Sequence, residues 1–242
     1  MKKVVILGSR QLCIEIIEII ELNKDLIIIG VLPPPFTGWW EDPVREFCKL
    51  NNYPVIKEID EIELLSIDLI LSVNYWKLIP EKIFNKCVTL NFHHSYKLKY
   101  RGRYSTTFAI INARKLDVWE HGTSIHRVNS SLDDGPLYFT DKLKILETDT
   151  AYTLFQKTEK LAVDLFKNNI QSIVNDDYNE IKKDSNYLYF EKKDLNHDLS
   201  SIEDVLELKD NIRALTFPSA EEPYLLIGKT KFKIIDIDNI KS

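Results

Sequence analysis

Short apolar runs alternate with segments of helical spacing along the first ninety residues. Helical spacing or a short helix is predicted for residues 11–23, 41–52 and 80–87. Buried strands are predicted at residues 2–9, 26–33, 53–56, 66–75 and 86–92. Strands that are apolar throughout and alternate with helices are typical of a parallel sheet covered on both faces. We therefore predict an α/β fold built on a doubly wound, mostly parallel, Rossmann-like sheet.

The predicted strands end in small or polar residues. Gly8 with Ser9, Asn74 with Tyr75, and Asn91 with His93 follow or end three of them. Sheets of this class bind ligands outside the carboxyl ends of their strands, so these pairs should face one crevice. Alternation along residues 89–95 (TLNFHHS) places Asn91, His93 and Ser95 on one face. His94 then points to the opposite face, where we expect it to be packed or hydrogen-bonded.

A second informative stretch covers residues 120–140. Residues 123–128 (TSIHRV) alternate as a strand, and residues 132–136 (LDDGP) predict a tight turn in which Gly135 supplies the permissive backbone. Asp133 or Asp134 then lies where the chain leaves the sheet. For His121 and His126, which frame the strand, a place in the site wall and a structural role both remain open.

The C-terminal part has a different pattern. Residues 201–216 predict an amphipathic helix, and residues 224–235 alternate around Gly228 and Lys229 as expected for a β-hairpin. We divide the chain into a catalytic domain, residues 1–185, and a small α+β extension, residues 186–242.

Composition narrows the function. The chain has 242 residues, 44% of them hydrophobic, and a net charge of -5, which argues against a nucleic-acid partner. Cys13, Cys48 and Cys87 form no C-x-x-C pair and are expected to be reduced thiols of a cytoplasmic protein. No segment qualifies as a membrane span.

The sequence lacks the motifs of several classes of enzyme. The turn at Gly8 has one glycine, where a dinucleotide site needs three, although a helix N-terminus beside Ser9 and Arg10 suits a simple phosphate. There is no H-E-x-x-H motif or Cys/His cluster for a metal, and no G-x-S-x-G elbow for a hydrolase. We expect no metal.

Four motifs in order resemble the signature of the folate-dependent formyltransferases. They are Asn91-x-His93-x-Ser95, YRGR at 100–103, HGTSIH at 121–126 and LDDGP at 132–136. The resemblance covers roughly residues 1–165 and implies the formyltransferase fold, with 10-formyltetrahydrofolate as co-substrate. It assigns the catalytic roles to Asn91, His93 and Asp133.

Formyl transfer needs donors for a developing negative charge and an acceptor for the amine proton. Asn91 and His93 can donate to the formyl oxygen, and His93 can also act as general base. Asp133 can orient His93, stabilise its charged form or relay the proton, and these roles remain open. The resemblance also implies a pterin pocket with two walls, made by Tyr75, Trp76, Lys77 and Leu78 on one side and Val128, Asn129 and Leu132 on the other.

The family that the chain resembles includes enzymes that formylate glycinamide ribonucleotide, methionyl-tRNA or amino sugars. Residues 187–242 hold eight Lys/Arg against eleven Asp/Glu, a balance that would repel tRNA. The tail is similar to the extension of enzymes that formylate nucleotide-linked amino sugars, which implies a homodimer and a role in lipopolysaccharide O-antigen synthesis. The acceptor favoured by analogy is dTDP-4-amino-4,6-dideoxyglucose. Phosphoribosylglycinamide formyltransferase and a non-catalytic folate-binding domain are the alternatives.

A dTDP-linked amino sugar needs local positive charge. The candidate substrate-binding residues are Ser9, Arg10, Lys77, Arg101, Arg103 and Tyr104. Trp39 and Trp40 either stack on the base or form a self-packed turn. Residues 95–98 read SYKL where the family often has SLLP, which points to a different sugar acceptor.

Overall fold

The computed structural model describes residues 1–35, 43–218 and 220–234. Trp39 and Trp40, the candidate base-stacking pair, lie outside the described residues. Within the described residues, no helix combines the length and the apolar character that a membrane crossing requires.

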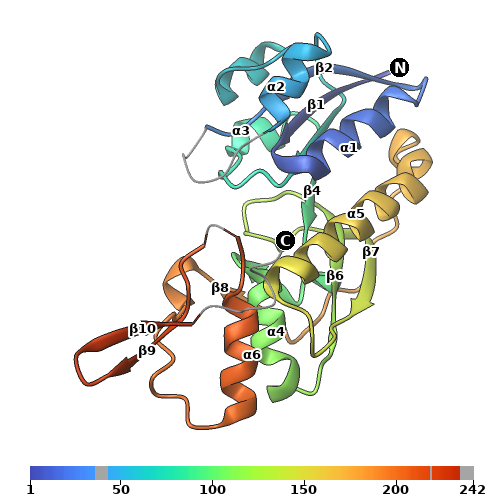
Figure 1. Ribbon diagram of the computed structural model, residues 1–242. Helices are drawn as coiled ribbons and strands as arrows, with labels where there is room; N and C mark the ends of the chain where they lie inside the picture. The colour runs from blue at the N-terminus through green and yellow to red at the C-terminus, as the bar shows by residue number, and fades with distance from the viewer. Residues whose placement is uncertain (36–42, 219, 235–242) are drawn as a thin grey trace.

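A six-stranded sheet forms the centre of the molecule, in the order β2-β1-β3-β4-β6-β7 (Figure 1). The first four of these pair in parallel, and β6 and β7 are antiparallel. The predicted α/β class and mostly parallel sheet are confirmed. The strands are β1 (Lys2–Gly8), β2 (Leu26–Leu32), β3 (Leu69–Val73), β4 (Val88–His93), β6 (Glu120–Arg127) and β7 (Leu137–Lys144).

The alternation of side chains along β1 shows how both faces of the sheet are covered. Val4 and Ile6 are buried in the core beneath α1 (Arg10–Glu21), α2 (Pro43–Leu50) and α5 (Ala151–Val174). Val5 and Leu7 are buried in a second core with η1 (Ile59–Leu64) and α3 (Glu81–Phe84). Residues 4–7 of β1 are all apolar because neither face of the sheet meets water there.

One predicted strand is wrong. Residues 53–56 form a single bridge, in which the Val31 N–H donates to the Pro54 carbonyl and the Ile56 N–H donates to the Val31 carbonyl, both at 2.8 Å. Proline has no N–H for a ladder, so this short segment stays at the sheet edge.

The predicted C-terminal helix and hairpin are both present. They are α6 (Val205–Leu215) and the antiparallel pair β9 (Tyr224–Ile227) and β10 (Thr230–Lys233). Figure 1 shows α6 alongside α4 (Ser105–Lys115), and the hairpin extending away from the rest of the molecule. A short parallel pair, β5 (Tyr100–Gly102) with β8 (Leu188–Phe190), joins the extension to the first half of the chain. The remaining 3-10 turns are η2 (Tyr96–Leu98) and η3 (Lys192–Asp194).

A buried carboxylate fixes α6 against α4. Asp210 accepts from Arg114 Nε at 2.7 Å and from Arg213 Nε at 2.9 Å, and only 2% of its surface is exposed. Arg213 also donates to the Leu146 and Asp149 carbonyls, at 3.0 and 2.8 Å. Two guanidinium groups therefore depend on one carboxylate.

Replacing Asp210 should loosen this helix. Asp210→Ala leaves the buried Arg213 without its charge partner, so we expect a loss of about 3 kcal/mol in the free energy of unfolding. Urea denaturation measures this. Glu207→Ala is the control: Glu207 lies on the same helix as Asp210, and its partly exposed ion pair with Lys115 of α4 should contribute less than about 1 kcal/mol. Equal losses would show that Asp210 has no special role.

Candidate functional site

Three strand ends meet where the sequence predicts a crevice. At Gly8 a side chain would place its Cβ 2.5 Å from Cys13 Sγ, so the turn from β1 into α1 needs glycine. Ser9 is tied to the end of β3, because its N–H donates to the Val73 carbonyl and its Oγ donates to the Asn74 carbonyl at 2.8 Å. The register between β3 and β4 pairs Ser72 with Asn91, which brings the predicted catalytic strand alongside.

The Asn91 carboxamide is held from both sides. Its Oδ1 accepts from Ser72 Oγ at 2.8 Å, and its Nδ2 lies 3.2 Å from Nε2 of His126. Asn91 and His126 are directly paired residues on β4 and β6.

His93 ends β4 and is almost fully buried. Its Nε2 lies 2.6 Å from the Tyr100 carbonyl, which can only accept, so Nε2 carries a proton. Nδ1 faces Asp133 Oδ2 at 3.7 Å, which is within ion-pair range but longer than a hydrogen bond. Nδ1 is therefore the nitrogen that can gain a proton, and Asp133 would stabilise the resulting charge.

Asp133 joins two loops. Its Oδ2 accepts from the Gly102 N–H at 2.9 Å, and its Oδ1 lies 3.6 Å from His126 Nε2. Burial by itself would raise the pKa of Asp133, but the neighbouring His93 and the Gly102 N–H, which donates to the carboxylate, hold the pKa below its usual range. The carboxylate is therefore charged at neutral pH.

The turn that carries Asp133 differs from its prediction in one respect. The positive φ falls on Asp133 itself, at 49°, a region that aspartate tolerates better than most residues. Gly135 is needed because a Cβ there would lie 1.7 Å from the Arg127 carbonyl oxygen. Close approach, and not a left-handed backbone, explains this glycine.

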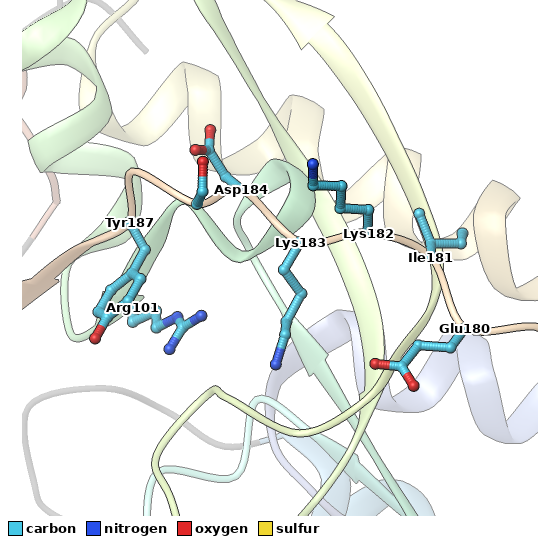
Figure 2. Close-up of a pocket in the computed structure, with 8 residues that line it drawn as sticks. Arg101, Glu180, Ile181, Lys182, Lys183, Asp184 and Tyr187 are labelled. Atoms are coloured by element: carbon cyan, nitrogen blue, oxygen red, sulfur yellow. The ribbon is translucent and has the colours of Figure 1, made fainter.

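A hollow of about 640 Å³ lies beside this turn, lined by residues 180–185, Arg101 and Tyr187 (Figure 2). Arg101 is 5% exposed, pairs with Asp134 at 2.7 Å, and stacks 3.7 Å from the centre of the Tyr187 ring. Lys183 Nζ also donates to Asp134, to its Oδ1 at 2.9 Å and to its main-chain carbonyl at 2.6 Å. Residues 180–190 thus fix the turn next to Asp133.

Comparison with known proteins finds a family match in the part of the chain that carries these residues. Residues 53–170, which carry Asn91, His93 and Asp133, match the family model described as formyl transferase. The chain therefore contains a formyl transferase domain.

Relatives and solved structures extend the likeness over the whole chain. The methionyl-tRNA formyltransferase of Mycoplasma mycoides subsp. mycoides SC is 28% identical, over 98% of this chain and 80% of its own. That of Mesoplasma florum is 26% identical over 78% of this chain, and the chain spans 64% of its length. A 4-N formyltransferase from Francisella tularensis has the same fold, with a TM-score of 0.81, 22% identity and 96% of each chain covered.

An N-formyltransferase from Helicobacter canadensis, solved with folinic acid and dTDP-3-aminofucose, is also similar. Its TM-score is 0.77, its identity is 25%, and the match covers 96% of this chain and 86% of that one.

The predicted pterin walls follow two different strands. Trp76 and Leu78, after β3, are 49% and 79% exposed, and Leu132, between β6 and β7, is 46% exposed. Tyr75 is half-buried, and Lys77 Nζ lies 5.8 Å from the centre of the Trp76 ring. On the second segment, the Val128 N–H donates to Thr89 and the Asn129 side chain accepts from the Ser131 N–H. The assignment of both segments to a formyltransferase cofactor stays a prediction.

The predicted substrate residues are not equivalent. Arg101 is engaged by Asp134, and Ser9 Oγ is engaged by the Asn74 carbonyl. Arg10 lies over the Phe155 ring at 5.0 Å. Arg103 and Tyr104 are exposed, between β5 and α4. Whether these residues bind substrate stays a prediction.

His94 and His121 are both buried and pack against other parts of the fold. His94 packs against Phe155, with ring centres 5.0 Å apart, and burial holds its pKa well below the ordinary value. Burial also lowers the pKa of His121 to about 3, and its Nε2 lies 3.2 Å from Thr106 Oγ1. Both rings are therefore neutral near pH 7. The structure places His121 away from water, at 1% exposure.

The sequence did not indicate three residues that support the site, Lys183, Tyr187 and Glu159. Lys183 and Tyr187 lie about fifty residues after the turn that they fix, in a segment without a motif. Glu159 on α5 accepts from Asn74 Nδ2 at 2.8 Å, at the end of β3. An acidic residue on the buried side of an amphipathic helix was the available sign for Glu159.

No group of three or more His, Cys, Asp or Glu in the described part of the chain is arranged to hold a metal ion.

Glu159 should make stability depend on pH. Burial raises its pKa to about 6, against the opposing Asn74 hydrogen bond. As pH rises, Glu159 loses its proton in the unfolded state at a lower pH than in the folded state. The free energy of unfolding of the wild type therefore falls as pH rises from the unfolded-state pKa of Glu159 to its folded-state pKa. Glu159→Gln removes this loss, so its advantage in unfolding free energy should grow between pH 4.5 and 6.5 by on the order of 1 kcal/mol. Urea denaturation at several pH values tests this, and a constant difference would contradict it.

Proposed function

We propose that the protein transfers the formyl group of 10-formyltetrahydrofolate to the amine of a dTDP-linked amino-dideoxy sugar, most favourably dTDP-4-amino-4,6-dideoxyglucose. The observation that carries this proposal is the convergence of Asn91, His93 and Asp133. Asp133 Oδ2 lies 3.7 Å from His93 Nδ1, while Asn91 is fixed on the neighbouring position of β4.

When bound, 10-formyltetrahydrofolate supplies an electrophilic formyl carbon. Asn91 stabilises the charge that develops on the formyl oxygen. Its Oδ1 is turned toward Ser72 and one N–H toward His126, so the second N–H is free to donate.

His93 takes the proton that the attacking amine must lose. Its Nε2–H is committed to the Tyr100 carbonyl, which leaves Nδ1 as the base. Asp133 is charged and lies beside Nδ1, so it stabilises the imidazolium as it forms. Of the three roles open for Asp133, charge stabilisation fits this geometry best.

Apolar side chains support the assignment of the pterin pocket. Trp76, Leu78 and Leu132 each leave more than two fifths of their surface exposed, which is unusual for three large apolar residues in segments predicted to share one ligand. A planar ring packed between them would cover that surface.

A dTDP-linked amino sugar as acceptor is supported by the match, over 96% of this chain, to the Helicobacter canadensis enzyme, which was solved with dTDP-3-aminofucose. Arg103 and Lys77 are exposed and available for a diphosphate, in contrast to the engaged Arg101. We further propose a cytoplasmic enzyme whose product is used in lipopolysaccharide O-antigen synthesis.

Formylation of methionyl-tRNA is the second candidate. It is favoured by 28% identity to a methionyl-tRNA formyltransferase over 98% of this chain. The tail, with eight Lys/Arg against eleven Asp/Glu, argues against a tRNA partner.

The direct test is calorimetric titration with dTDP, followed by an assay of tetrahydrofolate release with four acceptors. The acceptors are the 4-amino sugar nucleotide, a 3-amino isomer, methionyl-tRNA and glycinamide ribonucleotide. Turnover with the 4-amino sugar nucleotide supports the proposal in full. Turnover with the 3-amino isomer instead changes only the position of the amine in the proposed acceptor. Turnover with methionyl-tRNA or glycinamide ribonucleotide alone would reject it, as would absence of turnover with all four.

Substitution within the triad should act on kcat. We expect Asn91→Ala, His93→Ala and Asp133→Asn each to lower kcat by about 10²–10³-fold while the protein stays folded, because each removes a donor, a base or a charge. Ser130→Ala, in the same connection as Asp133 and exposed, is the control and should retain activity. Near-normal turnover in any one variant would reject the role assigned to that residue.

The extension should mediate a homodimer. Leu226, Ile227 and Phe232 on the hairpin are 44%, 66% and 49% exposed, and a two-stranded hairpin is marginal without a packing surface. We expect Ile227→Asp with Phe232→Asp to convert a dimer into a monomer in sedimentation velocity. Leu64→Asp changes a leucine that is 89% exposed on η1 and should leave the dimer intact. A monomeric wild type would contradict the proposal.

A further inference from the structure

His126 is a deeply buried polar side chain in contact with the site. It lies on β6 with 2% of its surface exposed, and it contacts Asn91 and approaches Asp133. The triad derived from the family resemblance does not include it.

The backbone determines which nitrogen of His126 is protonated. Nδ1 lies 3.0 Å from the Arg127 carbonyl oxygen, which can only accept. In the neutral ring, Nδ1 therefore carries the proton and Nε2 carries the lone pair. Nε2 points at Asn91 Nδ2, 3.2 Å away, so it accepts one of the two amide protons.

This acceptor determines the orientation of the Asn91 carboxamide. Ser72 Oγ, 2.8 Å from Asn91 Oδ1, completes the arrangement on the other side. If the amide were flipped, its oxygen would face a lone pair on His126. The observed orientation directs the second N–H away from both partners.

We infer that His126 is a positioning residue for formyl transfer, which orients the Asn91 amide so that one N–H donates to the formyl oxygen. This inference rests on the proposed function for its chemistry. His126 does not touch the substrate, and its whole effect passes through Asn91. Donors that are held in place before the reaction need no reorganisation during it, which is why their orientation affects kcat.

The distance to Asp133 argues against a different role. His126 Nε2 is 3.6 Å from Asp133 Oδ1, compared with 3.2 Å to Asn91 Nδ2. A nitrogen with its proton directed at Asp133 could not also accept from Asn91. The shorter contact and the Arg127 carbonyl select the amide as the partner.

Two conservative variants of His126 distinguish the role of Nε2 from the role of Nδ1. His126→Gln places a carboxamide oxygen near the position of Nε2, so it can still accept from Asn91. His126→Asn is shorter and places its amide near Nδ1, so it can still donate to the Arg127 carbonyl but cannot reach Asn91. A merely structural role would depend on filling the buried space and would favour neither nitrogen.

Kinetics should follow the Nε2 position. We expect His126→Asn to lower kcat by about 10–100-fold, less than loss of a full oxyanion donor, with KM changed by less than about threefold. His126→Gln should keep kcat within about fivefold of wild type. In an Asn91→Ala background, His126→Asn should cost less than about twofold more, because the residue that it orients is gone. Equal losses in both variants, or fully additive losses in the double variant, would overturn the inference.

A measurement without any acceptor separates this inference from the proposed function. Side-chain amide exchange by NMR should show one Asn91 amide proton protected in the wild type and in His126→Gln, and unprotected in His126→Asn. Histidine nitrogen spectra near pH 8 should show Nδ1 protonated in His126. If no acceptor is formylated but these signals are as expected, the proposed function fails and the positioning contact stands. An Asn91 amide unaffected by His126→Asn would overturn the contact itself.

Discussion

A buried, charged carboxylate links the parts of this site. Asp133 is 8% exposed and lies between the imidazoles of His93 and His126, with the Gly102 amide as its direct donor. An unpaired charge at such depth would be strongly unfavourable, so the surrounding groups must stay in place for the fold as well as for the chemistry. The left-handed backbone at Asp133, the close approach of Gly135 to Arg127 and the paired Asp134 all serve to hold this one side chain.

The neutral groups around the carboxylate are oriented by the main chain. The Tyr100 carbonyl determines the proton position on His93, and the Arg127 carbonyl does so on His126. Because carbonyls accept only, neither imidazole can take the other neutral tautomer without losing a hydrogen bond. The main-chain carbonyls therefore determine which nitrogen of each imidazole carries the proton. The position of the proton on His126 in turn determines the orientation of the Asn91 amide.

Much of this arrangement was predictable from sequence, for physical reasons. Strands buried on both faces, such as residues 4–7, are apolar throughout, and ordered motifs selected Asn91, His93 and Asp133 as candidates, which the structure brings close together. Other features were not accessible. The strand predicted at residues 53–56 is only a single bridge, because Pro54 has no N–H to donate to a neighbouring strand. The sequence does not show whether that N–H would be needed, since this depends on where the residue lies in the ladder. Lys183 and Tyr187 approach the site through tertiary contact alone, and no local pattern encodes a distance between residues fifty positions apart.

The path of residues 180–190 also bears on how the molecule is made. This segment pairs Ile181 with Leu137 and Leu188 with Tyr100, contacts that span 44 and 88 positions in the chain. Contacts at such separation form late, because a large loop must close before they contribute stability. During synthesis all strands of the six-stranded sheet, including the strand that carries Asn91 and His93, are made well before this segment emerges. The nascent chain therefore contains every triad residue before it contains residues 180–190, and the Asp133 turn becomes rigid only after that segment has emerged and packed.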